Sequence, residues 1–396
     1  MRKANLFGLA TIVLLLALGS IPALGAGADS ICTPEGCTVP KPGQPAKSLP
    51  AYNDYALLIA GISHPESTLT ACQEWPAWVR HAKFFDRNWE SFTRTRLSPM
   101  RQWASQELGS ASAATVFYPF SGPDFVNAFV LFPHAKTYLL IALEPVGAIP
   151  DFSGCQEQNF FASLQRSLYD LLQLDFFKTN QMRSSLGKGD LKGTLPVLMF
   201  FLAREQARVL DVQYWVMEPD GTIAESPAVG AKPSSTGIPG VRIVFTSPGS
   251  TENQTLYYFQ FDLGNNSFGR NQQFVSFLKS FGPVTTFTKA ASYLMFKPYF
   301  SGIRQFILDQ SLHVLQGDSG IPVRYFDPAV WNLRFYGTYT GPIALFSNCY
   351  QPDMATIYCG EEVQPLPFGF DYRHRVRTSN LMFAAKKAKV LADNPN

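Results

Sequence analysis

The chain has 396 residues, of which 46% are apolar, 14% aromatic and 16% charged. Such a composition supplies a large hydrophobic core and excludes disorder outside the tails. With 33 basic and 30 acidic residues, the net charge of +3 gives no case for nucleic-acid binding.

Residues 1–28 have the three parts of a secretory signal peptide. Arg2 and Lys3 form a positive start, an apolar run over 6–18 follows, and small residues at 26–28 suit cleavage. The apolar run is shorter than the about 20 residues that span a bilayer. We therefore predict an exported protein, periplasmic or extracellular, with no transmembrane segment after cleavage and a mature chain of 31 basic and 30 acidic residues.

Six cysteines remain after this cleavage, and an even number in an exported chain favours disulfide bonds. Proximity in the sequence suggests the pairs Cys32–Cys37 and Cys349–Cys359, which leaves Cys72 to pair with Cys155. No second pair at zinc-finger spacing accompanies the first two cysteines, so a small disulfide loop is a better interpretation than a metal site.

Residues 29–51 are rich in proline and predict an extended N-terminal tail. A single α/β globular domain is expected over 52–396. Apolar residues at helical spacing predict a helix from residue 78 to residue 92. Ser98, followed by Pro99, predicts the start of a second helix that ends at Gly109.

Strands and helices alternate from residue 114 to residue 316. The sequence predicts strands at 114–120, 137–143, 212–217, 241–246, 256–261 and 313–315, helices at 125–132, 161–172, 274–281 and 300–307, and a core helix or strand at 195–203. Residues 219–240 predict a loop insertion, because Pro, Gly, Ser and Ala dominate them. The alternation predicts a mixed or mainly parallel sheet flanked by helices, a Rossmann-like three-layer α/β fold with an irregular C-terminal part.

Segment 115–144 combines a strand, a turn with Gly122, a helix and a second strand that ends at Glu144. It resembles the first unit of Rossmann-like folds, including class I methyltransferases, in which an acidic residue stands about 20 residues after a glycine-rich turn. Only one of the three glycines of that pattern is present, and Pro123 follows it. The resemblance therefore implies the topology, and we predict no organic cofactor.

Polar residues are expected to gather at the carboxyl ends of the parallel strands. They are Ser121, Asp124, Glu144, Glu218, Asp318 and Ser319. Several carboxylates in one crevice could hold a divalent metal ion, or divide into general acid and base if their environments differ. The candidate catalytic residues are Asp124, Glu144, Asp318 and Ser319; the alternative is that each caps a helix or a turn separately.

Two further sequence patterns contain residue types that could carry chemistry. Gly317-Asp318-Ser319-Gly320 resembles the nucleophile loop of chymotrypsin-like proteases, but no histidine of this chain neighbours a cysteine as in those enzymes. We reject a protease unless His64 or His81 lies against Ser319. The aromatic residues Tyr325, Trp331, Tyr336 and Tyr339 could stack on sugar rings or peptides, and core packing is the favoured interpretation.

Three classes of function remain open, so whether the chain is an enzyme is undecided. The first is a hydrolase acting on an envelope or extracellular substrate. The second is a binding protein without catalysis, for a small molecule or an envelope polymer. The third is an assembly factor of the cell envelope. Convergence of Asp124, Glu144 and Asp318 in one pocket would favour the enzyme, and separate positions would favour binding.

Overall fold

A computed structural model of the protein describes residues 31–33, 36–38, 51–109, 113–152, 155, 158–174, 191, 193–227, 237–291, 293–360 and 362–388. The chain divides into two compact units, Met1–Ser48 and Leu49–Asn396. In the first unit, β1 (Ile31–Thr33) and β2 (Gly36–Thr38) pair antiparallel with Cys32 opposite Cys37. The predicted signal peptide, most of the predicted tail and the side chains of these two cysteines lie outside the described residues.

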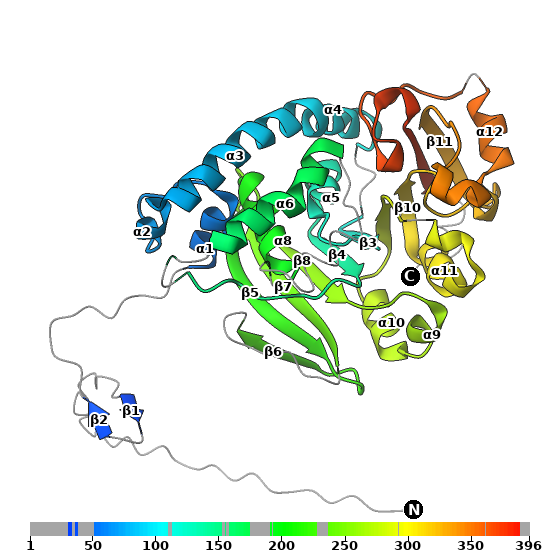
Figure 1. Ribbon diagram of the computed structural model, residues 1–396. Coiled ribbons are helices and arrows are strands. Elements are labelled where there is room, and N and C mark those ends of the chain that lie inside the picture. Colours follow the sequence, from blue (N-terminus) through cyan, green and yellow to red (C-terminus); the bar gives the residue numbers. More distant parts are fainter. Residues whose placement is uncertain are drawn as a thin grey trace, which may run out of the picture. The chain divides into compact units, whose positions relative to one another are not determined.

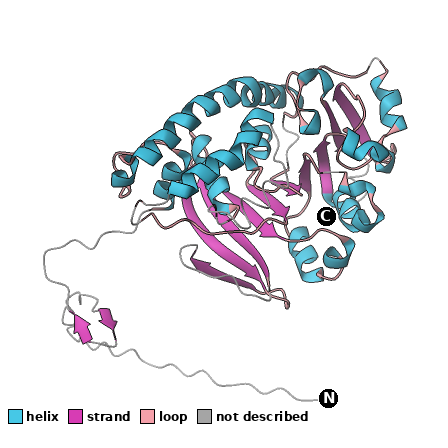
Figure 2. Ribbon diagram, in the orientation of Figure 1, coloured by secondary structure: helices cyan, strands magenta, loops and turns pink. Residues whose placement is uncertain are grey.

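A mixed sheet forms the centre of the second unit (Figure 1, Figure 2). Among the described residues it has ten strands, in the order β11-β12-β10-β9-β3-β4-β8-β7-β5-β6. The strands are β3 (Thr115–Pro119), β4 (Thr137–Ala142), β5 (Arg208–Met217), β6 (Ile223–Pro227), β7 (Ile238–Thr246), β8 (Asn253–Gln260), β9 (Val284–Thr288), β10 (Ser311–Gln316), β11 (Trp331–Gly337) and β12 (Asn380–Lys386).

Five neighbouring strands in the middle of the sheet are parallel: β10, β9, β3, β4 and β8. Chain order reverses between β3 and β9, as at the switch point of a Rossmann-like sheet. The strands β3, β4, β8, β9, β10, β11 and β12, counted in chain order, lie in the order 3-2-1-4-5-7-6. The predicted α/β fold is confirmed, and the resemblance seen in 115–144 extends to this part of the sheet.

Helices cover both faces of the sheet (Figure 2). One face carries α1 (Tyr52–Ala60), α2 (Thr70–Gln73), α3 (Pro76–Phe92), the π-helical turn η1 (Thr93–Leu97), α4 (Ser98–Glu107), α5 (Phe125–Leu131), α6 (Gln158–Leu174) and α8 (Leu195–Arg204). The other carries α9 (Asn265–Phe268), α10 (Gln272–Lys279), α11 (Ser301–Gln310) and α12 (Pro352–Tyr358). Short 3₁₀ turns are η2 (Leu294–Phe296), η3 (Pro298–Phe300), η4 (Val323–Tyr325), η5 (Ala344–Cys349), η6 (Asp371–Arg373) and η7 (Val376–Thr378).

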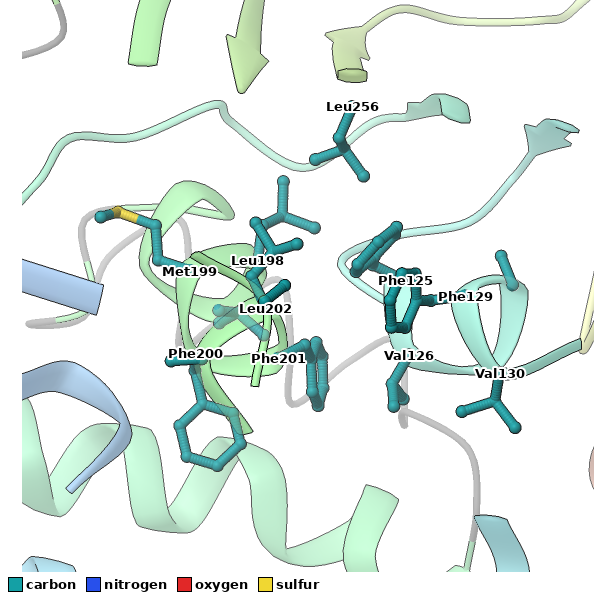
Figure 3. Close-up of a cluster of buried hydrophobic side chains, with 14 of the residues drawn as sticks. Phe125, Val126, Phe129, Val130, Leu198, Met199, Phe200, Phe201, Leu202 and Leu256 are labelled. Carbon is teal, nitrogen blue, oxygen red and sulfur yellow. The ribbon is translucent and has the colours of Figure 1, made fainter. Parts of the chain in front are cut away.

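The two faces of the sheet have separate hydrophobic cores because side chains alternate along each strand. In β3, Val116 and Tyr118 belong to the larger core and Phe117 to the smaller one. The segment 195–203, which the sequence left open between helix and strand, is the wholly buried helix α8. Figure 3 shows side chains of α5, α8 and β8 gathered in the larger core.

Three local expectations differ from the structure. The short, threonine-rich β9 was not predicted, and β6 forms inside the segment 219–240 that was expected to be a loop, because it can pair with the long strand β5. The C-terminal part, expected to be irregular, contributes β11 and β12, which pair over seven residues. Helix α4 does begin at Ser98, as predicted, but it has no capped start of its own, because η1 continues α3 into α4.

The cysteines give one confirmation and one correction. Cys72 and Cys155 form a disulfide bond, as predicted, across a sequence separation of 83. Cys349 and Cys359 are free, so the predicted bond between them is wrong. Helix α12 lies between the two and adds about 10 Å of rise, whereas bridged Cα atoms lie within about 7 Å.

No helix in the described ranges is long and apolar enough to cross a membrane.

Candidate functional site

The predicted catalytic residues follow the parallel strands at their carboxyl ends, where the topology brings distant segments together. Asp124 follows β3, Glu144 follows β4, and Asp318 and Ser319 follow β10. Lys289, which directly follows β9, was not predicted because β9 itself was missed. This edge of the sheet contains the switch point between β3 and β9, the usual place for a ligand in such folds.

Asp124 and Lys289 form a buried ion pair. Lys289 Nζ lies 2.9 Å from Asp124 Oδ2, and their side chains are 0% and 7% exposed. Asn127 Nδ2 donates a hydrogen bond to Asp124 Oδ1 at 2.7 Å, and Tyr118 OH donates to Oδ2 at 3.3 Å. Asp124 makes no side-chain cap on helix α5. Both oxygen atoms of the Asp124 carboxyl group are therefore bound by neighbouring side chains.

Asp318 and Asp371 form a second acidic centre. Tyr293 OH donates to Asp318 Oδ2 at 2.8 Å, and Asn380 Nδ2 donates to Asp318 Oδ1 at 3.0 Å. Ser319 Oγ donates to Asp371 Oδ2. Gly317 makes this approach possible, because a Cβ atom there would lie only 2.7 Å from Asp371 Oδ2.

The two aspartates hold protons more tightly than ordinary carboxyl groups. Burial, and next the charge of Asp318, raise the pKa of Asp371 to about 7, while the bond from Ser319 and the charge of Lys289 act in the opposite direction. Burial also raises the pKa of Asp318, against the bonds from Asn380 and Tyr293. Two neighbouring buried carboxylates resist ionising together. We call Asp124, Lys289, Tyr293, Asp318, Ser319, Asp371 and Asn380 the carboxyl-edge network.

The backbone around this network is strained. Phe120, Ala290, Tyr293 and Asp371 have φ between 51° and 60°, although none is glycine. Such conformations cost on the order of 1–3 kcal/mol each and tend to gather at functional sites. Here they are concentrated in the segments after β3 and β9 and before β12.

The carboxyl-edge network is nevertheless closed. Lys289, Asp318, Ser319, Asp371 and Asn380 are all buried. The Tyr293 ring is covered by Phe346, with ring centroids 5.0 Å apart. No group of three or more His, Cys, Asp or Glu residues in the described part of the chain could hold a metal ion. The contacts found here are internal ones, so the network has the character of a buried structural centre.

The other predicted site residues lie elsewhere. Glu144 follows β4 at the same edge but outside the network, and its backbone carbonyl accepts a hydrogen bond from Tyr258 OH at 2.7 Å. Ser121 Oγ donates to the Gly122 carbonyl at 2.9 Å. Glu218 is in the turn between β5 and β6, in the antiparallel part of the sheet. Of the predicted set, Asp124, Asp318 and Ser319 belong to the network.

The contacts recorded for His64 and His81 do not involve Ser319. His81 Nε2 bonds the Ile59 carbonyl at 2.8 Å and is buried against Phe85 and Phe161. His64 Nδ1 lies 3.5 Å from Asp54. These contacts place both histidines among the N-terminal helices, so the condition for a protease is not met. Of the four aromatic residues expected to pack in the core, Trp331 and Tyr336 are buried, Tyr339 is half-buried and Tyr325 is exposed.

An open groove lies at the opposite, amino edge of the parallel strands, with a volume of about 1310 Å³. Its walls come from α3, η1, α4, the end of α8, the segment before β4 and the turn between β7 and β8. We call it the polar groove. Its lining includes Trp89, Glu90, Thr93, Arg94, Ser98, Arg101, Phe129, Lys136, Arg204, Glu205, Gln206, Glu252 and Asn253.

Two unusual backbone features stand in the wall of the polar groove. The π-helical turn η1 supplies Thr93 and Arg94, and π-helical turns are rare and frequent at functional sites. Gln206, at the end of α8, has a φ of 60°. The groove could not be predicted from the sequence, because its lining residues are scattered from residue 62 to residue 254 and share no motif.

Ion pairs balance most of the charge in the polar groove. Arg101 Nη2 contacts Glu205 Oε2, and Lys136 Nζ lies 3.9 Å from Glu252 Oε2. Burial raises the pKa of Glu205, and the Arg101 charge opposes that shift. Arg204 Nη1 lies 2.8 Å from Asp86 Oδ1. The walls thus combine paired charges with neutral polar side chains.

Comparisons of this chain with models of protein families, with curated proteins and with solved structures find no match.

Proposed function

We propose that this chain is a ligand-binding protein without catalysis and that the polar groove is its binding site. The observation that carries the proposal is the contrast between the two edges of the sheet. The groove is open and holds about 1310 Å³, whereas the carboxyl-edge network is buried and its polar groups bond to one another. Ligand sites in proteins are concave and largely preformed.

We further propose that the protein is exported and binds its ligand in an oxidising compartment outside the cytoplasm. The tripartite leader at residues 1–28 predicts export, and the Cys72–Cys155 disulfide bond is the kind of link that persists in such compartments. A periplasmic or extracellular location is part of the proposal. A mass measurement of the exported protein tests it, and retention of residues 1–28 would contradict it.

A thermal-shift screen of the disulfide-intact chain against metabolites, oligosaccharides and peptides tests the binding function. A groove variant, Arg94→Ala with Asn253→Ala, is compared with a matched variant on α10, Gln273→Ala with Lys279→Ala. A ligand at a hundredfold excess over its Kd stabilises a protein by about 2.7 kcal/mol. We expect this gain in the wild type and the α10 variant and its loss in the groove variant. Equal stabilisation of all three proteins would refute the groove as the site.

A second candidate function, a hydrolase, is favoured by one observation. Asp371 has a pKa of about 7 and accepts a hydrogen bond from Ser319, so it could exchange a proton near neutral pH. A hydrolase screen with and without added divalent metal tests it. If the wild type turns over a substrate and Asp371→Asn does not, the protein is a hydrolase and the binding proposal is refuted. If added metal stabilises the wild type but not Asp124→Ala or Glu144→Ala, the reaction is metal-assisted.

A further inference from the structure

We infer that the polar groove binds an extended, uncharged glycan. The inference rests on the proposed function, since it names the ligand class of the same groove. Thr93 is half-buried in the lining, Ser98, Gln206 and Asn253 are exposed there, and no hydrogen bond joins these four side chains to another described residue. Their hydroxyl and amide groups both donate and accept, which is what a ligand with neighbouring hydroxyl groups requires.

The charge in the groove argues against a polyanion. Arg101 is paired with Glu205, and the exposed Lys136 has Glu252 as an opposite charge 3.9 Å away. Asp86, outside the groove, neutralises Arg204. Arg94 and Glu90, one helical turn apart, carry opposite charges. A polyanion site needs several cations that are free to exchange counter-ions for the ligand, and this lining offers no such excess.

The position of the groove argues against an extended peptide. Peptides commonly bind by adding a strand to a free sheet edge. The part of the sheet that reaches the groove is the turn between β7 and β8, and β8 is paired on both sides, with β4 and β7. The groove walls are otherwise helices and turns, so recognition there depends on side chains.

The size of the groove suits a chain of several sugar units. Its volume of about 1310 Å³ exceeds the roughly 300–1,000 Å³ of pockets that enclose one small molecule. Trp89 and Phe129, both largely buried, contribute apolar surface at its wall. Because only 8% of Trp89 and 5% of Phe129 is exposed, the amide and hydroxyl groups of the lining would make most of the contacts to a sugar.

The test uses the full disulfide-intact chain on an array of neutral and acidic oligosaccharides, followed by calorimetric titration with the neutral tetrasaccharide that gives the strongest signal. The groove variant is Gln206→Gly with Asn253→Ala, because glycine tolerates the φ of 60° at position 206. The control variant is Gln273→Ala on α10. Each lost hydrogen bond is expected to weaken binding about five- to tenfold, and the control should bind as the wild type does. Affinity should hardly change between low and high salt.

Failure of the inference can be told apart from failure of the proposed function. Dextran sulfate and a mixed peptide library serve as the competing probes. If a neutral oligosaccharide does not bind and one of these probes binds in a way that Gln206→Gly with Asn253→Ala weakens, the glycan is refuted and the groove stands. If neutral oligosaccharides bind equally well to the groove variant, or if no probe binds and the metabolite screen also gives no stabilisation, both proposals are overturned.

Discussion

Replacing Lys289 by methionine would leave the Asp124 carboxylate buried without its counter-ion. Lys289 is fully buried and Asp124 is 7% exposed, so water cannot replace the missing ammonium group. Breaking a buried pair from one side costs about 3–5 kcal/mol. Asp124 keeps the bonds from Asn127 and Tyr118, so we expect the lower end, about 3 kcal/mol. Methionine fills a similar volume to lysine, so little of the loss in unfolding free energy would come from a cavity.

Urea unfolding of Lys289→Met, Asp124→Asn and the double variant measures this loss as a thermodynamic cycle. The double variant removes both charges and should be more stable than the sum of the single losses predicts, by at least about 1.5 kcal/mol. The slope of the unfolding free energy with urea should stay unchanged, which would show that the fold is retained. A loss below about 1 kcal/mol for Lys289→Met, or losses that simply add, would refute the buried-pair argument.

Three further predictions concern the second acidic centre and the free cysteines. The pKa of Asp371 is about 7 in the folded chain, against about 3.9 when unfolded, so its stabilising proton is fully held below about pH 4 and lost as the pH rises through 7. Urea unfolding between these values should show stability falling with pH, and Asp371→Asn should flatten that fall; an unchanged slope would contradict the assignment. Gly317→Ala should cost about 1–3 kcal/mol, because its Cβ would lie 2.7 Å from Asp371 Oδ2, whereas Gly360→Ala, whose nearest atom lies at 3.2 Å, should cost less by the same assay. Iodoacetamide should label Cys359 in the folded chain and Cys349 only after unfolding, because Cys349 is buried and burial raises its pKa; a linked peptide in the mass map would contradict the free thiols.

Elements with strong periodicity could be predicted from the sequence, and those that depend on partners could not. The amphipathic pattern of α3 and the apolar runs of β3 and β4 are local signals. By contrast, β9 contains three threonines in five residues and is a buried strand because β3 and β10 flank it. Likewise, β11 and β12 are strands because each supplies the other with a partner.

Some residues of the carboxyl-edge network could likewise be predicted from local sequence signals, and others could not. Asp318 and Ser319 could be predicted, since a turn after a strand marks the carboxyl edge. Asp371 could not, because it reaches the network from a separate segment 52 residues after Ser319. Lys289 was missed together with its strand. The polar groove joins residues of helices and turns whose spacing in the chain carries no signal.

The rod formed by α3, η1 and α4 runs for 32 residues along one face of the sheet (Figure 1), which corresponds to roughly 48 Å. A π-helical turn is an α-helix with one residue inserted, and each residue of a helix turns it by about 100°. The insertion therefore sets the phase of α4, which directs Trp103 onto Tyr336 and Phe368, with ring centroids 5.0 and 5.6 Å away. A related chain that lacks one residue here would present a different side of α4 to β11. In an alignment, a related sequence with a one-residue gap at η1 would therefore be expected to pack its C-terminal strands against α4 through different side chains.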